Sequence, residues 1–172
     1  MDYRAARDDR GTGADVWVSA IIGLVFLMLG WNFAKYLGAA LTGRTYQTNV
    51  TWTAGPKAGQ AVAYPDLEGN PMLTDSAMFL FGLALVLEAV VLAVANGNAR
   101  FKRPLVGVAL AIAVAATAYN LYVAARLFSG GLLPLQSLLA VAFGGYIAAN
   151  QWRMFQDLGS GRGSASAGAL GR

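Results

Sequence analysis

The chain has 172 residues, of which 56% are hydrophobic and only 13% are charged, and its mean hydropathy is +0.48. Soluble domains carry about 25% charged residues, so this composition indicates an integral membrane protein and excludes a soluble enzyme. The chain contains no cysteine and no histidine. Its own residues therefore cannot form disulfides, iron–sulfur clusters, Cys- or His-ligated zinc sites or a His-ligated haem site.

Four apolar segments are long enough to cross about 30 Å of hydrocarbon as helices. They cover residues 16–38, 76–96, 104–127 and 133–155. The sequence therefore predicts an all-α integral membrane protein with a four-helix transmembrane domain over residues 16–155. A polar tail, residues 1–15, precedes this domain, and a Gly/Ser/Ala-rich tail that should be flexible, residues 156–172, follows it.

The basic residues predict the orientation of these helices. The net charge of +4 comes from side chains scattered between the apolar runs, which indicates topology and no nucleic-acid partner. Arginine and lysine gather before the first segment, between the second and third, and after the fourth. By the positive-inside rule, both termini are cytoplasmic in a multi-pass protein of an inner-type membrane. Arg100, Lys102 and Arg103 are expected to meet lipid headgroups.

The connection between the first two segments, residues 39–75, is then extracytoplasmic and long. Its TYQTNVTWT alternates as a strand does, AGPKAG is typical of a turn, and AVAYP is typical of a second short strand. A β-hairpin is therefore one candidate structure, although an isolated hairpin is marginally stable. Connections of this length are more often functional, or packed against a partner, than idle.

Small residues form stripes on three segments, which permits close approach of helices in membranes. The predicted packing residues are Gly30, Ala34 and Gly38 in the first segment, Gly107 and Ala111 in the third, and Gly144 and Ala148 in the fourth. These stripes can serve packing within the four-helix bundle or docking onto other membrane subunits, and the sequence leaves both open.

One carboxylate, Glu88, lies near the centre of the apolar run FLFGLALVLEAVVLAVA. At about 1.5 Å per residue, Glu88 matches Tyr146 in depth, with Asn150 one turn nearer the cytoplasm and Thr117 slightly further out. Lys35 lies too near the opposite face for a direct salt bridge with Glu88, and it can reach the interface by itself.

An intramembrane carboxylate is a functional hypothesis by default. Glu88 can be a protonated structural residue that bonds to Tyr146, Asn150 or a backbone carbonyl. It can also take part in proton or quinone-headgroup chemistry, or contact another subunit. A proton pathway usually strings several ionisable groups together, and Glu88 stands alone in its bundle, which disfavours a transporter. We predict no catalytic residue and no metal site.

The stretch GLVFLMLGWNFAKYLGA resembles the first helix of the DoxX/DoxD family of small four-helix membrane proteins. Gly23, Phe26, Gly30 and Lys35 match positions of that helix, and Glu88 resembles an acidic residue often found in the second helix of the family. The resemblance implies a four-helix bundle that serves in some cases as the quinone-linked membrane subunit of a sulfur-compound oxidoreductase.

Together, these features predict a non-catalytic accessory subunit of a larger membrane complex of the respiratory or photosynthetic electron-transfer type. The alternatives are a DoxX-like subunit of a quinone-linked oxidoreductase, which would contact the quinone near Glu88 or Lys35, and a small transporter or channel. The expected partners are other integral membrane subunits and membrane lipids. No covalent or His/Cys-ligated cofactor is expected, and the candidate ligands are a lipid, a quinone or a carotenoid.

Overall fold

A computed structural model describes residues 5–63 and 71–160, and the chain is mostly helical over these ranges. The elements are α1 (Ala5–Leu29), α2 (Trp31–Leu41), β1 (Gln47–Thr51), β2 (Ala61–Ala63), α3 (Pro71–Gly97), the 3-10 turn η1 (Ala99–Phe101), α4 (Lys102–Ser129) and α5 (Leu135–Gly159). Helix α1 begins at Ala5 and so takes in most of the predicted polar tail. The remaining parts of the two predicted tails, residues 1–4 and 161–172, lie outside the described residues.

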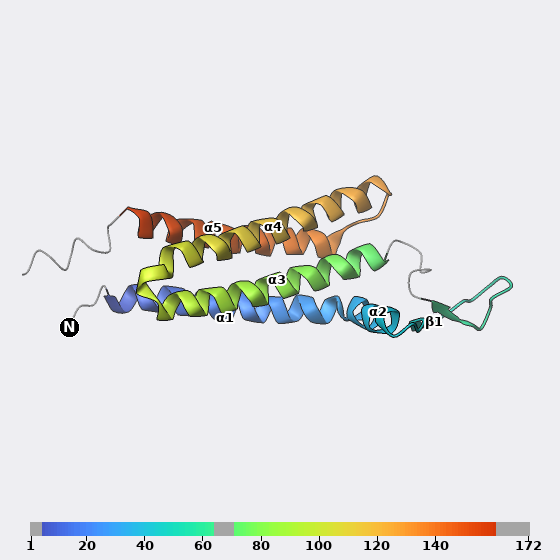
Figure 1. Cartoon of the computed structure of the whole chain (residues 1–172). Helices are drawn as coiled ribbons and strands as arrows, with labels where there is room; N and C mark the ends of the chain where they lie inside the picture. Colours follow the sequence, from blue (N-terminus) through green and yellow to red (C-terminus); the bar gives the residue numbers. More distant parts are fainter. Residues whose placement is uncertain (1–4, 64–70, 161–172) are drawn as a thin grey trace, which may run out of the picture.

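Four long helices lie side by side in an elongated bundle (Figure 1). Helix α3 is central, since it packs along both α1 and α4, and α4 packs in turn along α5. Helices α1 and α5 are not among the pairs that pack closely. The start of α1 and the end of α5 lie at the same end of the bundle (Figure 1). The bundle is therefore held together by three closely packed helix pairs, α1 with α3, α3 with α4 and α4 with α5, whereas α1 and α5 are not closely packed.

Two helices are long and apolar enough to cross a membrane, namely α3 from Met72 onward and the continuous segment Ala99–Ser129. A third span is obtained if α1 and α2 are counted together, although these helices are bent by 61° relative to each other. The first predicted segment, residues 16–38, is thus not a straight helix. The fourth, residues 133–155, is helical in α5, but polar residues such as Asn150 and Gln151 make it less apolar than α3 and α4.

Glycines set the close crossing of α1 and α3. A Cβ built on Gly82 would lie 2.6 Å from the carbonyl oxygen of Gly23, and one built on Gly30 would lie 2.6 Å from the carbonyl oxygen of Asp75. Distances this short mean that backbone meets backbone with no room for a side chain. Gly30 is also the residue at which α1 ends and the chain turns into α2.

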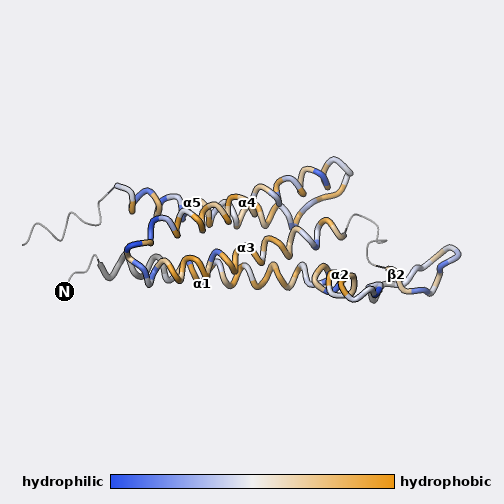
Figure 2. The backbone as a smooth tube through the Cα atoms, viewed as in Figure 1, coloured by the Kyte–Doolittle hydropathy of each residue, from blue (hydrophilic) through white to orange (hydrophobic). Residues whose placement is uncertain are grey.

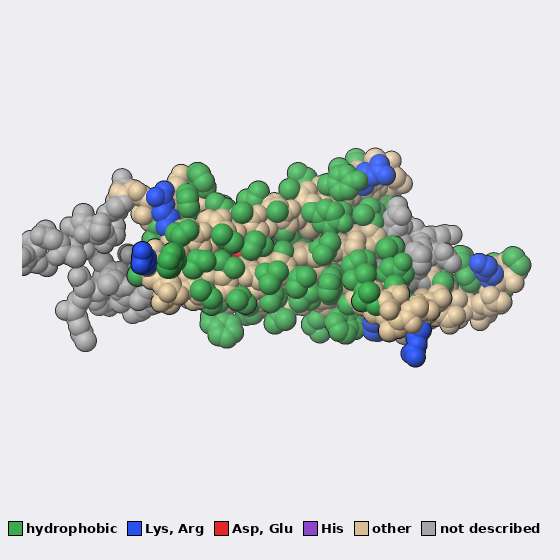
Figure 3. Space-filling model, in the orientation of Figure 1, with side chains coloured by type: hydrophobic (Ala, Val, Ile, Leu, Met, Phe, Trp, Pro, Cys, Tyr) green, Lys and Arg blue, Asp and Glu red, His purple; other side chains and the backbone are tan. Residues whose placement is uncertain are grey.

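The surface of the bundle is apolar around its middle. Figure 2 shows hydrophobic segments along the central part of each long helix, and Figure 3 shows hydrophobic side chains covering this face, with Lys and Arg side chains towards the two ends. Large hydrophobic residues such as Trp17, Met28 and Leu133 are at least 70% exposed. Such a surface is typical of a protein surrounded by lipid or by other apolar helices.

Strands β1 and β2 pair antiparallel, with Gln47 opposite Ala63, so the structure has the hairpin that the sequence offered as one candidate. Gly55 and Gly59 in its turn have φ values of 83° and 81°, a backbone conformation that side chains disfavour. The hairpin extends from the end of the bundle where α2 lies (Figure 1). Residues 64–70, which complete the predicted loop, lie outside the described residues.

Candidate functional site

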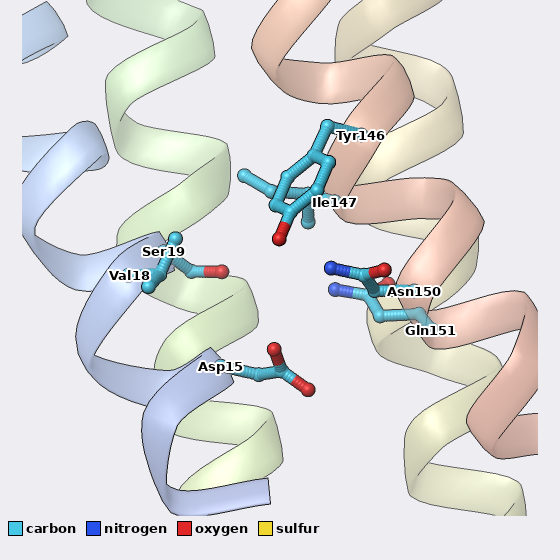
Figure 4. Close-up of a pocket in the computed structure, with 7 residues that line it drawn as sticks. All are labelled: Asp15, Val18, Ser19, Tyr146, Ile147, Asn150 and Gln151. Atoms are coloured by element: carbon cyan, nitrogen blue, oxygen red, sulfur yellow. The ribbon is translucent and has the colours of Figure 1, made fainter. Parts of the chain in front are cut away.

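The candidate site is the polar seam between α1 and α5, a small pocket of about 10 Å³, which suits roughly one water molecule. It is lined by Asp15, Val18, Ser19, Tyr146, Ile147, Asn150 and Gln151. Figure 4 shows the side chains of Asp15 and Ser19 reaching from α1 towards those of Tyr146, Asn150 and Gln151 on α5. Five polar side chains from two helices thus face one small space.

The helical repeat explains how these residues meet. Residues four apart lie one above the other on a helix face, as Asp15 and Ser19 do on α1. The pairs Tyr146 with Asn150 and Ile147 with Gln151 have the same spacing on α5. Each helix therefore presents one short polar stripe, and the two stripes face each other because α1 and α5 both flank α3.

Glu88 of α3 lies behind the seam, in the interior of the bundle. The Nε2 amide of Gln151 donates a hydrogen bond to Oε1 of Glu88, and the two side chains are only 1% and 0% exposed, respectively. The Ser19 hydroxyl and the Asp15 carboxyl also lie close enough to interact with the Glu88 carboxyl. Glu88 therefore joins α3 to α5 and meets the polar stripe of α1.

Two buried oxygens of this cluster, Oε2 of Glu88 and Oε1 of Gln151, accept no hydrogen bond of ordinary geometry from the described residues, although the Ser19 hydroxyl lies close to the Glu88 carboxyl. Buried polar atoms are hydrogen-bonded in the great majority of proteins, and an exception calls for a physical explanation. Because Gln151 lines the neighbouring pocket, a water molecule in that pocket would be the natural partner of its oxygen.

Apolar contacts bound the seam at both ends. On one side, the ring of Phe26 on α1 lies 6.3 Å from that of Phe143 on α5 and 4.8 Å from that of Phe81 on α3. On the other side, Val16 and Met154 both pack on the cluster around Leu92. The polar seam is therefore a local feature and not a continuous polar path through the bundle.

The residues predicted around Glu88 are not all brought together. Asn150 lines the seam, and Tyr146 lines it while being 60% exposed. The hydroxyl of Thr117 donates instead to the carbonyl oxygen of Ala113, 2.7 Å away within α4. Lys35 is exposed on α2, remote from the seam. The amide that bonds Glu88 is Gln151, which the sequence analysis did not single out.

The predicted packing residues divide into two groups. Gly30, Gly107 and Gly144 lie against neighbouring helices, Gly144 against Thr117 and Gly107 against Phe155. Ala34 and Ala148 are half-buried. By contrast, Gly38 has open space around it, and Ala111 is exposed. Packing within the chain thus uses part of each stripe and leaves the rest on the surface.

The predicted headgroup residues lie at the end of the bundle nearer the seam. The Arg100 guanidinium is 5.6 Å from the ring centre of Phe101, and that of Arg103 is 5.0 Å from the ring centre of Phe155. Lys102 is half-buried at the start of α4. The stacking on aromatic rings holds the two arginine side chains along the surface of the bundle.

A second pair of buried polar residues, Asn120 and Ser137, was also missed by the sequence analysis. Asn120 donates from Nδ2 to the carbonyl oxygen of Ala116, 3.0 Å away. Its Oδ1 and the Ser137 hydroxyl have no partner among the described residues. The available signal was the same as for Glu88, a polar residue within an apolar helix.

The described residues contain no group of three or more acidic, histidine or cysteine side chains that could hold a metal ion. No family model, curated protein or solved structure matches this chain.

Proposed function

We propose that this chain is a non-catalytic accessory subunit of a larger membrane-embedded complex, and that the seam between α1 and α5 receives a membrane helix of a neighbouring subunit. The observation that carries the proposal is the seam itself. Two long helices of the bundle leave between them an unclosed polar strip, within a surface that is otherwise apolar at this level.

The energetics of the seam favour an occupant. A polar group left unpaired in a hydrocarbon environment costs several kcal/mol by an order-of-magnitude estimate. Oε1 of Gln151, which lines the pocket, is such a group. Because this oxygen is buried, a polar side chain of a neighbouring helix would pair it through a water molecule in the pocket, and lipid tails cannot.

The flanks of the seam suit helix packing. Trp17 and Ile21 on α1, and Leu139 and Phe143 on α5, are exposed. Beside them, Gly145 on α5 has open space where a side chain would stand. Exposed small residues allow the backbone of a second helix to approach closely, so Gly145, like Ala111, supports contact between subunits.

The proposed topology has four membrane-crossing helices: α1, α3, α4 and α5. Helices α1 and α5 cross despite the bend after Gly30 and the polar residues in α5, because their outer faces are apolar. The end with Arg100, Lys102, Arg103 and Arg153 is the cytoplasmic side of an inner-type membrane. The hairpin is then extracytoplasmic.

We propose that this complex is of the respiratory or photosynthetic electron-transfer type. The chain has neither histidine nor cysteine, so a redox centre in such a complex would be held by the partner subunits. The chain would contribute assembly surface and lipid contacts.

Site-specific photo-crosslinking tests the proposal. In one variant Tyr146, at the seam, is replaced by p-benzoylphenylalanine. In the control, Tyr122 on α4 is replaced in the same way, because it is the same residue type and similarly exposed, at 56%. After irradiation of native membranes, we expect an adduct with a second membrane protein from position 146 and a much weaker one from position 122. An 18.0 kDa chain that migrates alone on a native gel, without adducts, would contradict the proposal.

A second candidate function is a DoxX-like subunit that contacts a quinone. It is favoured by the exposed Tyr146 and the half-buried Asn150 at the surface of the seam, since a quinone headgroup accepts hydrogen bonds from such donors. Replacement Asn150→Leu should then alter quinone-linked turnover of the host complex without changing its subunit composition. Unchanged turnover would argue against quinone contact.

A further inference from the structure

The short helix α2 differs from the other helices in its direction and in its surface. It is bent by 61° relative to α1, and none of its residues is buried. Figure 1 shows it turned away from the long axis of the bundle, at the end from which the hairpin extends. A helix that continued α1 across the membrane would run along the bundle axis.

The two sides of α2 have opposite character. Since successive residues turn by about 100° around a helix, Leu37 and Leu41 lie on one side, and Asn32 and Lys35 lie on the opposite side. Leu41 is 87% exposed, and Leu37 is also exposed. Asn32 accepts a hydrogen bond from the Tyr46 hydroxyl at 3.3 Å, which ties the polar side to the segment leading into the hairpin.

The contacts of α2 place it at a defined level of the bundle. The ring of Phe33 lies 5.9 Å from that of Phe79 on α3, and Gly30 abuts the backbone of α3 between Asp75 and Phe79. On α3 this is the level at which the polar stretch Thr74–Ser76 gives way to the apolar run that begins at Phe79. Helix α2 thus lies where the surface of the bundle changes from polar to apolar.

We infer that α2 is an interfacial helix that lies along the boundary between headgroups and acyl chains of the adjoining leaflet. Helices of this kind bury one apolar side about 5–10 Å into that boundary and keep the polar side in the headgroups. Leu37 and Leu41 point to the acyl chains. Lys35 and, beyond the helix, Arg44 reach the lipid phosphates. The partner of this surface is the lipid bilayer itself.

The last residues of α1, Met28 and Leu29, are exposed as well, so large apolar side chains are exposed both before and after the bend at Gly30. By this arrangement α2 sets the height of the hairpin above the membrane. The inference rests on the proposed insertion of the bundle in a membrane, but it does not require any partner subunit.

Depth measurements on spin-labelled variants test the inference. The chain has no cysteine, so single replacements Asn32→Cys, Lys35→Cys, Leu37→Cys and Leu41→Cys can each carry a nitroxide. All four positions are exposed, so no label replaces a buried side chain, although the label at position 32 also removes the hydrogen bond from Tyr46. The full chain is reconstituted alone in vesicles of phosphatidylcholine and phosphatidylglycerol, and the accessibility of each label to oxygen and to a water-soluble nickel chelate is compared.

The expected pattern is that labels at 37 and 41 favour oxygen, while labels at 32 and 35 favour the nickel chelate. The internal standard is the pair Leu24→Cys and Met28→Cys, two exposed positions one turn apart on α1. These should differ in depth by about 6 Å. Because α2 is bent by 61°, positions 37 and 41 should differ by less than about half of that.

Three outcomes would overturn the inference. A depth step between 37 and 41 as large as the standard would mean that α2 continues across the membrane. Access of the nickel chelate to all four positions would mean that α2 stands off the membrane. Shielding of 37 and 41 from both reagents would mean that protein covers them. Because no other subunit is present, none of these outcomes depends on whether the accessory-subunit proposal holds.

Discussion

Gln151 of α5 donates a hydrogen bond to Glu88 of α3, and both side chains are shielded from solvent. This contact links two helices that otherwise share little surface, since α3 packs mainly along α1 and α4. In an apolar environment such a contact stabilises modestly when it is made, and it is costly to leave half-made.

Replacement Gln151→Leu should lower the free energy of unfolding by about 1–2 kcal/mol, because it leaves the buried Glu88 carboxyl without its donor. Glu88→Gln should cost less, since an amide at position 88 can still accept from Gln151. Unfolding by SDS, followed by circular dichroism, measures these changes. The exposed Gln156→Leu on the same helix is the control.

The double replacement Glu88→Leu with Gln151→Leu tests whether the two side chains stabilise the fold through their mutual contact or independently of each other. Removing both partners should destabilise less than the sum of the two single replacements, because no buried polar group is then left unpaired. Strict additivity would show that the two side chains do not act as a pair.

Replacement Gly82→Ala should destabilise the bundle by about 1–3 kcal/mol, because the added methyl group would meet the backbone of α1 at Gly23 and Leu27 and force the helices apart. The same assay measures it. Gly38→Ala is the control, since its surroundings are open and alanine favours a helix over glycine by about 0.5–1 kcal/mol. Equal losses at positions 82 and 38 would rule out the close crossing.

Replacement Phe26→Ala should cost about 3 kcal/mol or more, because Phe26 is buried and its ring contacts those of Phe81 and Phe143. Met28→Ala, two residues along the same helix, removes a side chain that is 77% exposed and should change stability little. A small effect at Phe26 would mean that the apolar closure of the seam contributes little to the fold.

Replacement Gly59→Val should disturb the hairpin and leave the bundle intact. The φ value of 81° at Gly59 costs a side-chain-bearing residue about 1–2 kcal/mol, and a branched residue tolerates it least. We expect faster tryptic cleavage after Lys57 with unchanged helical content. Ala58→Val, next to it, should leave the cleavage rate near that of the unaltered chain. Unchanged cleavage in Gly59→Val would argue that the turn is not held in this conformation.

In the candidate site, the sequence predicted Glu88 and the helix that supplies its partner, but not which residue of that helix is the partner. Glu88 could be recognised from the sequence because a carboxylate in an apolar helix needs a partner, and depth along the helices indicated α5 as its source. Depth alone does not give the rotation of a helix about its axis, however. Asn150 and Gln151 are neighbours at almost the same depth but point about 100° apart, and packing turns Gln151 towards Glu88.

By itself, the sequence determined the membrane-compatible helices and the need of Glu88 for a polar partner, and it offered the hairpin as a candidate, because these follow from composition, local periodicity and turn residues. Only the tertiary structure decided the bend after Gly30, the choice of Gln151 and the open seam between α1 and α5. Each depends on how close two helix backbones come and how each helix is rotated. Those quantities are set by contacts between residues far apart in the chain, such as Gly23 with Gly82, and no local pattern contains them.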